Sequence, residues 1–379
     1  MSVALTPDLR DLLALNLVPG VGPRLTAALL ERFVTIDRVL AATVDQLQEV
    51  PRVGEELAAR IAAAAKSAET EAEAERVVKS GVRLLALGTP EYPVALSSID
   101  DAPPLLYCRG DVLLSDANAV AIVGSRKCTG YGRRIAERIA GGLARAGVCV
   151  VSGLARGIDA VAHRAALAAG GRTLAVVANG LSRVYPPEHA ELAMEIAAAG
   201  AVLTESSMAT GPQAGLFPAR NRIISGLSRI VVVVEAPEQS GALITATHAG
   251  EQGRAVMAVP GPVDSDTSGG CNALIRDGAI LCRGVDDVLE ELHGVSVMAQ
   301  AGEPSAQPAT TPAAASTEPP SGLDDGQKRL WAFLADGPRT MDEMAQQLGM
   351  AVPALSAALM MMEMKKVLRR LPGNRYERI

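Results

Sequence analysis

The residues best suited to bind an anion are arginines and small residues in loops that follow apolar runs. Ten of them form three groups: Gly124, Ser125, Arg126 and Thr129; Gly153, Arg156 and Gly157; and Arg220, Asn221 and Arg222. Glycine permits a tight turn, and the arginine guanidinium offers a fork of N–H donors. A helix that starts after such a turn points free amide N–H groups at an anion. We therefore predict a site that binds phosphate groups.

Familiar nucleotide and metal signatures are missing. No GxxxxGK[ST] phosphate loop occurs. The run Gly130-Tyr131-Gly132 approaches a GxGxxG fingerprint, but Ile135 stands at the third glycine, and the next apolar run ends in VVSG without an acidic residue for a ribose. The four histidines lack HxxxH or HExxH spacing. We expect neither a nucleotide cofactor nor a bound metal.

Several charged residues allow two interpretations. Arg220 and Arg222 either contact the ligand or form internal ion pairs that shape the site. Asp159 is expected to cap a helix or pair with an arginine. Glu205 and Glu235 end apolar runs and could act as acid–base groups. The favoured interpretation is that these two glutamates fix arginines or loop amides.

The pattern from residue 118 onward predicts an α/β fold. Continuous Val/Ile/Ala runs indicate strands near 119–123, 148–152, 173–178, 201–204, 230–235, 255–259 and 279–282, and a separate strand is expected earlier, at 82–86. Amphipathic segments indicate helices near 131–146, 158–169, 188–199, 219–227 and 241–252. Apolar strands that alternate with helices form a parallel sheet covered on both faces, with ligands at the carboxyl ends of its strands. The expected core is an extended Rossmann-like sheet over 76–298.

Composition narrows the class further. The chain has 379 residues, is 49% hydrophobic and carries a net charge of −6, which argues against a basic coat protein but leaves room for a local basic cleft. Five scattered cysteines without CxxC spacing fit a reducing cytoplasm. The apolar run 230–234 is far shorter than a membrane span, and the N-terminus lacks the pattern of a signal peptide.

Two further regions flank the predicted core. Residues 1–75 contain LVPGVG and EVPRVG, each followed by an amphipathic helix, which is the pattern of paired helix-hairpin-helix elements. Their turns either approach a phosphate or simply reverse the chain in a small helical bundle. Residues 299–322 are rich in Ala, Pro, Ser and Thr, and predict a flexible linker.

The C-terminal segment 323–379 predicts a winged helix. It shows three helical patterns and then KVLRRLPGNRYERI, a basic hairpin that turns at Pro372-Gly373-Asn374. Its second and third helices would meet around Leu348-Gly349. Methionines 360, 361, 362 and 364 make the third helix apolar, which favours packing or partner contact over reading of DNA bases.

The motifs VGSRKCTGYG, SGLARGIDAVAH, FPARNRIISGLS, GALITATHA and VPGPVDSDTSGGCNALIRDGA, in this order over about 118–283, resemble the DprA/Smf family of bacterial DNA-processing proteins. The helical N-terminal region and the C-terminal winged helix fit the same family. The resemblance implies a homodimer that binds and protects single-stranded DNA and loads RecA recombinase onto it during natural transformation. It further implies that Gly124, Ser125 and Arg126 line the DNA pocket beside Arg156 and Gly157, and that residues 271–281 form the dimer contact.

One departure concerns the loop at Tyr185-Pro186. Many relatives have a basic residue just after this pair, whereas Pro187 and Glu188 follow it here. An expected phosphate contact is therefore lost, and Arg183 is one replacement.

Two other functions stay open. A nucleotide- or nucleoside-monophosphate-processing enzyme would use the same kind of loops, but the Pro-Gly-Gly-x-Gly-Thr signature of such enzymes is absent and only Gly269-Gly270-Cys271-Asn272 is a faint echo. A duplex-DNA regulator would bind through residues 324–379. The favoured interpretation is a DNA-binding protein that is not an enzyme.

Overall fold

The computed structural model describes residues 5–302 and, beyond them, 323–334, 339–348, 350, 355–356, 358–359, 361–362, 365, 367–371 and 375–378. The chain divides into two units, residues 1–303 and 304–379. Among the described residues, no helix is long and apolar enough to cross a membrane.

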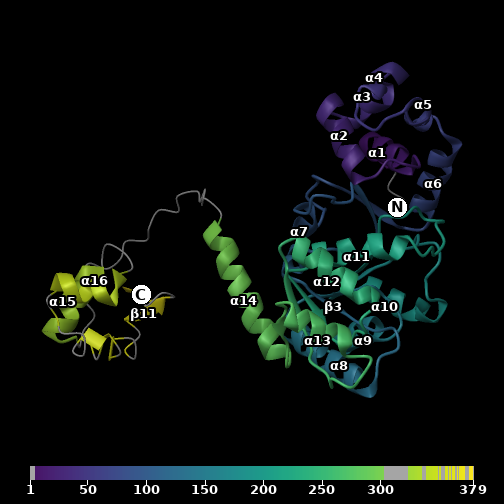
Figure 1. The fold of residues 1–379 in the computed structure, drawn as a ribbon. Coiled ribbons are helices and arrows are strands. Elements are labelled where there is room, and N and C mark those ends of the chain that lie inside the picture. Colours follow the sequence, from purple (N-terminus) through teal and green to yellow (C-terminus); the bar gives the residue numbers. More distant parts are fainter. Residues whose placement is uncertain are drawn as a thin grey trace. The chain divides into compact units, whose positions relative to one another are not determined.

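The first unit begins with six helices (Figure 1). They are α1 (Pro7–Leu17), α2 (Pro23–Phe33), α3 (Ile36–Ala41), α4 (Val44–Gln48), α5 (Glu55–Ala64) and α6 (Ala68–Lys79). The two predicted hairpins are present, because α2 and α5 each start directly after a glycine, Gly22 and Gly54. Gly20 and Arg52 hold matching positive φ angles of 97° and 70° in the two turns. Leu29, Leu47 and Ile61 are completely buried between these helices.

Nine strands then form one sheet in the order β1-β2-β6-β5-β4-β3-β7-β8-β9. They are β1 (Arg83–Ala86), β2 (Leu105–Gly110), β3 (Val120–Val123), β4 (Val150–Ser152), β5 (Thr173–Val176), β6 (Ala201–Thr204), β7 (Ile230–Val233), β8 (Ala255–Ala258) and β9 (Ile280–Leu281). The predicted parallel sheet is correct from β6 to β9. The other edge adds a strand that was not predicted, β2, which runs antiparallel to both β1 and β6 and makes the sheet mixed.

Helices cover both faces of the sheet (Figure 1). These helices, with two 3-10 turns, are α7 (Val94–Ser97), η1 (Leu114–Asn118), α8 (Gly130–Arg145), α9 (Ile158–Ala168), η2 (Pro187–His189), α10 (Ala190–Ala199), α11 (Leu216–Gly226), α12 (Gly241–Glu251), α13 (Gly269–Arg276) and α14 (Val285–Gly302). Side chains of one strand alternate between the faces: Val120 and Ile122 pack with α8, α9 and α14, whereas Ala121 and Val123 pack with α11 and α12. Helix α14 continues past the expected start of the linker at 299, and the linker from 303 to 322 lies outside the described residues.

The second unit contains α15 (Asp325–Phe333), α16 (Met341–Leu348), β10 (Arg339–Thr340), β11 (Leu368–Leu371) and β12 (Arg375–Arg378). The strands form a small antiparallel sheet, as a winged helix requires. Met362 is buried with Leu330 and Trp331, while Met361 is 49% exposed. The residues Gly349, Met360, Met364 and 372–374, which the sequence analysis singled out, lie outside the described residues.

A buried histidine makes the stability of the first unit sensitive to acid. His163 Nδ1 lies 2.7 Å from the hydroxyl of Thr173, which itself donates to the Val150 carbonyl, so His163 must be the donor. Its Nε2 has no hydrogen-bond partner among the described residues. Burial lowers the pKa of His163 to about 3.

We predict that this histidine destabilises the fold as the pH falls below about 6.5. The unfolded chain binds a proton there and the folded chain does not, so stability is complete above the unfolded pKa and falls by up to about 1.4 kcal/mol per pH unit below it. The free energy of unfolding, measured with urea between pH 7.5 and 5, should fall less steeply with decreasing pH in His163→Gln than in the wild type. The exposed His293 supplies the control, and an equal change of slope in His293→Gln would contradict the assignment.

Candidate functional site

The first Gly/Arg loop leaves the carboxyl end of β3. Ser125 is fixed on both sides: its N–H donates to the Glu235 carbonyl at 2.6 Å and its carbonyl accepts from Ile158 N at 3.1 Å. A side chain at Gly124 would lie 2.7 Å from Ile158 Cγ1, so only glycine fits there. Arg126 follows as an exposed residue, with its guanidinium 5.1 Å from the ring centre of Phe217. The loop is therefore rigid beneath an accessible cation.

The second loop leaves the neighbouring strand β4 and is organised by Asp159. The Asp159 carboxylate accepts from Gly153 N at 3.1 Å and from Ala155 N at 3.3 Å. Burial raises the pKa of Asp159, and the nearby Arg220 and these amides act in the opposite direction. Asp159 does not cap α9, whose N-cap residue is Gly157, but it binds these two loop amides and favours the charged form of Arg220. It holds the loop that carries Arg156.

Arg220 is a buried cation between the two loops. Its side chain is 5% exposed, and Nη1 donates to the Val176 carbonyl at 2.6 Å. Its Nε has no hydrogen-bond partner among the described residues. Burial lowers the pKa of Arg220 to about 10, although Asp159 favours its charged form. A side chain at Gly153 would collide with this guanidinium, so Gly153 makes room for Arg220.

Arg222 does not join this group. It is buried on the other side of α11, where it pairs with Glu205 and donates to the Asp101 carbonyl at 2.7 Å. Its position agrees with the internal ion pair that the sequence analysis weighed against ligand binding. Asn221 lies between Arg220 and Arg222 in the sequence, and its side-chain amide donates to the Gly241 carbonyl at 3.1 Å. Glu205 thereby fixes an arginine, as expected.

The hydrogen-bonding groups of Thr129 are also used within the protein. Glu235 accepts from the Thr129 hydroxyl at 2.9 Å and from the Thr129 amide, while the Thr129 hydroxyl accepts from Gly132 N and caps α8. Glu235 therefore fixes loop amides, and neither glutamate is free for acid–base chemistry. Thr129 borders a separate hollow beside Tyr131 and Pro260.

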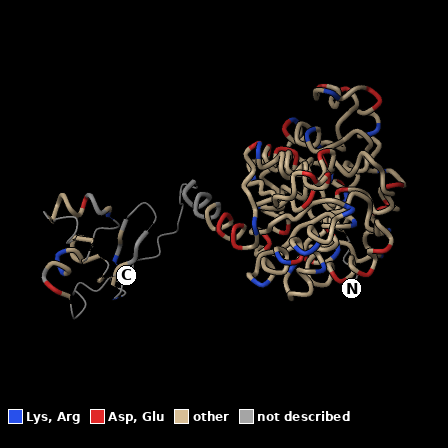
Figure 2. The backbone as a smooth tube through the Cα atoms, turned by 60° about the horizontal axis from the view of Figure 1, so that its bottom comes forward, with Lys and Arg blue, Asp and Glu red and all other residues tan. Residues whose placement is uncertain are grey.

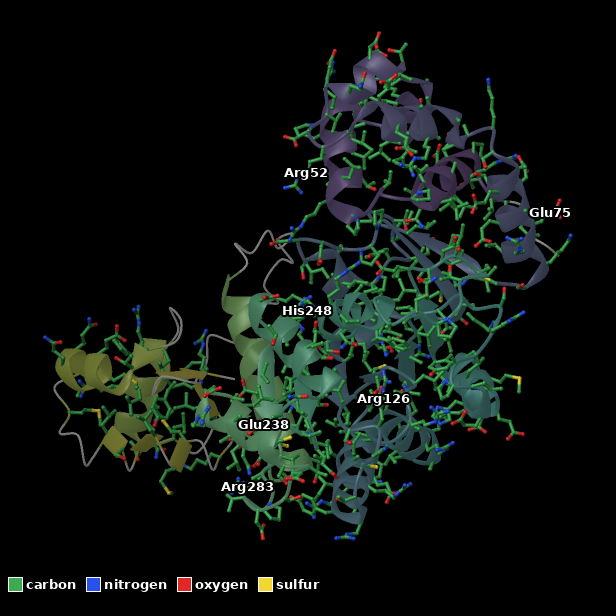
Figure 3. The ribbon with its side chains drawn as sticks, turned by 45° about the vertical axis from the view of Figure 1, so that its right-hand side comes forward. Arg52, Glu75, Arg126, Glu238, His248 and Arg283 are labelled. Atoms are coloured by element: carbon green, nitrogen blue, oxygen red, sulfur yellow. The ribbon has the colours of Figure 1, made fainter. Side chains whose placement is uncertain are left out.

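One cavity of about 660 Å³ lies at the carboxyl ends of the strands, and its lining includes Gly124, Ser125, Arg126, Arg220 and Asn221. Gly153 and Arg156 line a smaller neighbouring hollow, and Gly157 lines neither. The lining of the cavity also includes the cation Lys127, the carboxylates of Asp159 and Asp266, and the apolar side chains of Phe217 and Ile224. Figure 3 shows Arg126 in the sheet-bearing part of the first unit, well apart from Arg52 on the helical hairpins. Lys127 and Phe217 were not singled out from the sequence. The sequence offered one signal for each: Lys127 directly follows Arg126, and Phe217 begins the FPARN motif.

Arg156 lines a narrow extension of this cavity together with Tyr185 and Phe217. Its Nε lies 2.5 Å from an oxygen of Glu188, and hydrogen bonding in this pair raises the pKa of Arg156 and lowers that of Glu188. The segments that carry Arg156 and Glu188 are held together by His189, which donates from Nδ1 to the Leu154 carbonyl at 2.9 Å. Arg183 is exposed but does not line the cavity or its extension.

We predict that Glu188 weakens anion binding at Arg156. A phosphate must compete with the carboxylate, so Glu188→Gln should raise affinity for a polyanion several-fold and steepen its salt dependence by about 0.7 in log K against log[salt]. Fluorescence anisotropy of a labelled oligonucleotide across a salt series measures both. Glu191→Gln changes the net charge equally on the neighbouring turn of the chain, and an identical gain there would rule out the competition.

Comparison with known proteins agrees with each part of this fold. The family pattern for DNA recombination-mediator protein A matches residues 83–293, the DprA winged helix domain matches 311–374, and the SAM-like helix-hairpin-helix tandem matches 10–67. Protein Smf of Synechocystis is 34% identical over 388 residues, covering 97% of this chain and 98% of that protein. DNA processing protein DprA of Bacillus subtilis is 43% identical over 215 residues, covering 56% of this chain and 72% of that protein.

Two solved structures are similar to the chain. DprA from Streptococcus pneumoniae superposes with a TM-score of 0.66 at 34% identity, covering 76% of this chain and 99% of that one. DprA from Helicobacter pylori, whose structure concerns its single-stranded DNA binding mode, gives 0.50 at 29% identity, covering 58% and 96%. The sheet and its cavity thus define a recombination-mediator core. The chain belongs to the DprA/Smf family.

Proposed function

We propose that the chain binds single-stranded DNA in the Arg126 cavity, protects it, and supports loading of RecA recombinase during natural transformation. The observation that carries this proposal is the exposed Arg126 beside Lys127, neither of which forms an ion pair with a carboxylate among the described residues. Exposed cations on a rigid glycine loop bind backbone phosphate without reading sequence. The Helicobacter pylori relative, whose structure concerns binding of single-stranded DNA, supports the same ligand.

The proposed role needs no catalysis by this chain. Glu205 and Glu235, the possible acid–base residues, do not line the cavity and hold Arg222 and the Thr129 loop instead. This occupation makes a nucleotide-processing enzyme the weaker alternative. All five cysteines are free, which fits the reducing cytoplasm we assign to the protein.

A homodimer would increase the avidity for long DNA, because one cavity contacts few nucleotides. We propose residues 271–281 as its contact. This segment contains most of α13 and all of β9, the outermost strand, whose Ile280 and Leu281 are 40% and 43% exposed. We also retain four functional segments: helical 1–75, core 76–298, linker 299–322 and winged helix 323–379.

The test has two stages. The pure protein should bind labelled oligothymidine and a mixed sequence with similar affinity, weaken steeply with salt, and protect the strand from an exonuclease. It should then accelerate RecA ATPase activity on DNA already coated with single-strand binding protein. Failure to bind at low salt would refute the DNA role, whereas binding without RecA stimulation would refute only the loading step.

A further inference from the structure

The solvent-facing side of α8 carries a row of arginines. Arg134, Arg138 and Arg145 lie four and eleven positions apart, so at 3.6 residues per turn they share one side of the helix. All three are exposed. The flanks of α8 are covered, since Gly141 faces Ala165 on α9 and Gly142 faces Val285 on α14. The arginines therefore stand on the ridge between two neighbouring helices, which we call the α8 ridge.

The placement of Arg134 and Arg138 is unfavourable for the helix itself. The first turn of α8 contains no acidic residue, and Arg133 and Arg134 lie close to its partly positive N-terminus. Arg134 and Arg138 also form a like-charge pair at i,i+4, a spacing that destabilises a helix. Glu137 is the one acidic residue of the helix. Arg145 lies in the last turn, where a cation is favourable, so helix stability accounts for Arg145 but not for Arg134 or Arg138.

The ridge residues also lack the carboxylate partners that other surface cations have. Lys79 on α6 lies 2.8 Å from Glu75, and Arg32 on α2 lies 2.6 Å from Glu49. Among the described residues, neither Arg134, Arg138 nor Arg145 forms an ion pair within 4.0 Å. Arg138 donates to the Arg283 carbonyl at 3.1 Å. Their charges remain available to an external anion.

The ridge follows the proposed DNA site along the chain. Arg126 and Lys127 lie three and two residues before Thr129, the N-cap of α8, so the cationic loop connects to the end of the helix that carries Arg134. Figure 2 brings forward the bottom of the first unit, where Figure 1 places α8, and shows both basic and acidic positions there. From Arg134 to Arg145 the helix rises about 16 Å. This length suits several successive phosphates of an extended strand, on a chain whose net charge is −6.

We propose that single-stranded DNA leaving the Arg126 cavity continues along the α8 ridge, with its phosphates on Arg134, Arg138 and Arg145. The inference rests on the proposed function and extends it from a local pocket to a path. The ridge contacts phosphate alone and adds no sequence preference. It makes affinity rise with strand length, because a short oligonucleotide fills only the cavity.

The test is fluorescence anisotropy with oligothymidines of six and twenty nucleotides, using the variant R134Q/R138Q/R145Q. We expect the six-mer to bind as in wild type and the twenty-mer to bind about tenfold more weakly. The salt slope for the twenty-mer should fall by up to about 2, since each single-strand phosphate contact contributes about 0.7. The melting temperature should stay equal or rise, because like-charge repulsion is removed.

The control removes three positive charges at exposed, carboxylate-paired positions, in the variant R32Q/R60Q/K79Q. If it weakens the twenty-mer equally, the effect is one of net charge and the ridge is not a path. If R134Q/R138Q/R145Q lost affinity equally for both oligonucleotide lengths, or had a lower melting temperature, the ridge would support the fold or the cavity. A changed oligomeric mass by light scattering would assign the ridge to a protein contact. Absence of six-mer binding by wild type would instead refute the proposed function.

Discussion

Replacing Arg126 by alanine should weaken binding of single-stranded DNA by about tenfold or more at low salt. A charge-assisted hydrogen bond to phosphate contributes roughly 1.5–3 kcal/mol, and each 1.4 kcal/mol is a factor of ten. The side chain is exposed, and no carboxylate among the described residues pairs with it. Its loss should therefore remove binding without opening the core.

The salt dependence separates a phosphate contact from a general effect. In Arg126→Ala the slope of log K against log[salt] should fall by about 0.7, the value for one single-strand phosphate. Thermal unfolding should be unchanged. Arg60→Ala, an exposed arginine on α5, supplies the control. Equal weakening in both variants, or an unchanged slope in Arg126→Ala, would place the DNA elsewhere on the surface.

The strands of the core could be predicted because their signal is local. Runs such as Ile230–Val233 are continuously apolar, as a parallel sheet covered on both faces requires. Strand β2 was missed because Leu105–Gly110 follows two prolines and finds its partner β6 about a hundred residues later. An antiparallel edge of this kind depends on pairing between distant segments, which single-sequence periodicity does not report.

The residues of the cavity were likewise predicted only in part from local sequence. Gly124 and Arg126 lie two positions apart in one turn and both line the cavity, so their grouping was predictable. Arg220 and Arg222 were grouped as well, yet residues two apart on a helix point about 200° away from each other. Helical phase therefore allows only one of them to face the cavity, and the structure gives that position to Arg220.

The ion pair between Arg156 and Glu188 joins residues that lie 32 positions apart. The sequence showed that the loop after Tyr185 lacks a basic residue, but it could not show where Glu188 points. That direction depends on the buried His189, whose hydrogen bond to the Leu154 carbonyl places the two loops side by side. Contacts between distant loops follow from the completed fold.

Gly157→Ala should cause the largest loss of stability among single changes near the site. Gly157 has φ 74° and ψ −129°, a conformation that residues with a side chain rarely adopt. An added Cβ would also collide with the Ser125 carbonyl oxygen and lie 2.8 Å from the Arg126 carbonyl carbon. Strain and displacement together should cost about 3 kcal/mol or more, lowering the melting temperature by roughly 10 °C.

A matched glycine separates these two causes. Gly170 has nearly the same φ of 73°, at the end of α9, but an added Cβ meets nothing within 4 Å. Gly170→Ala should therefore cost only about 1 kcal/mol and leave DNA affinity unchanged. Gly157→Ala should also weaken DNA binding, because it pushes apart the Arg126 and Arg156 loops that Ser125 and Ile158 hold together. If the two variants were equally stable and bound DNA alike, close contact between these loops would not be what shapes the site.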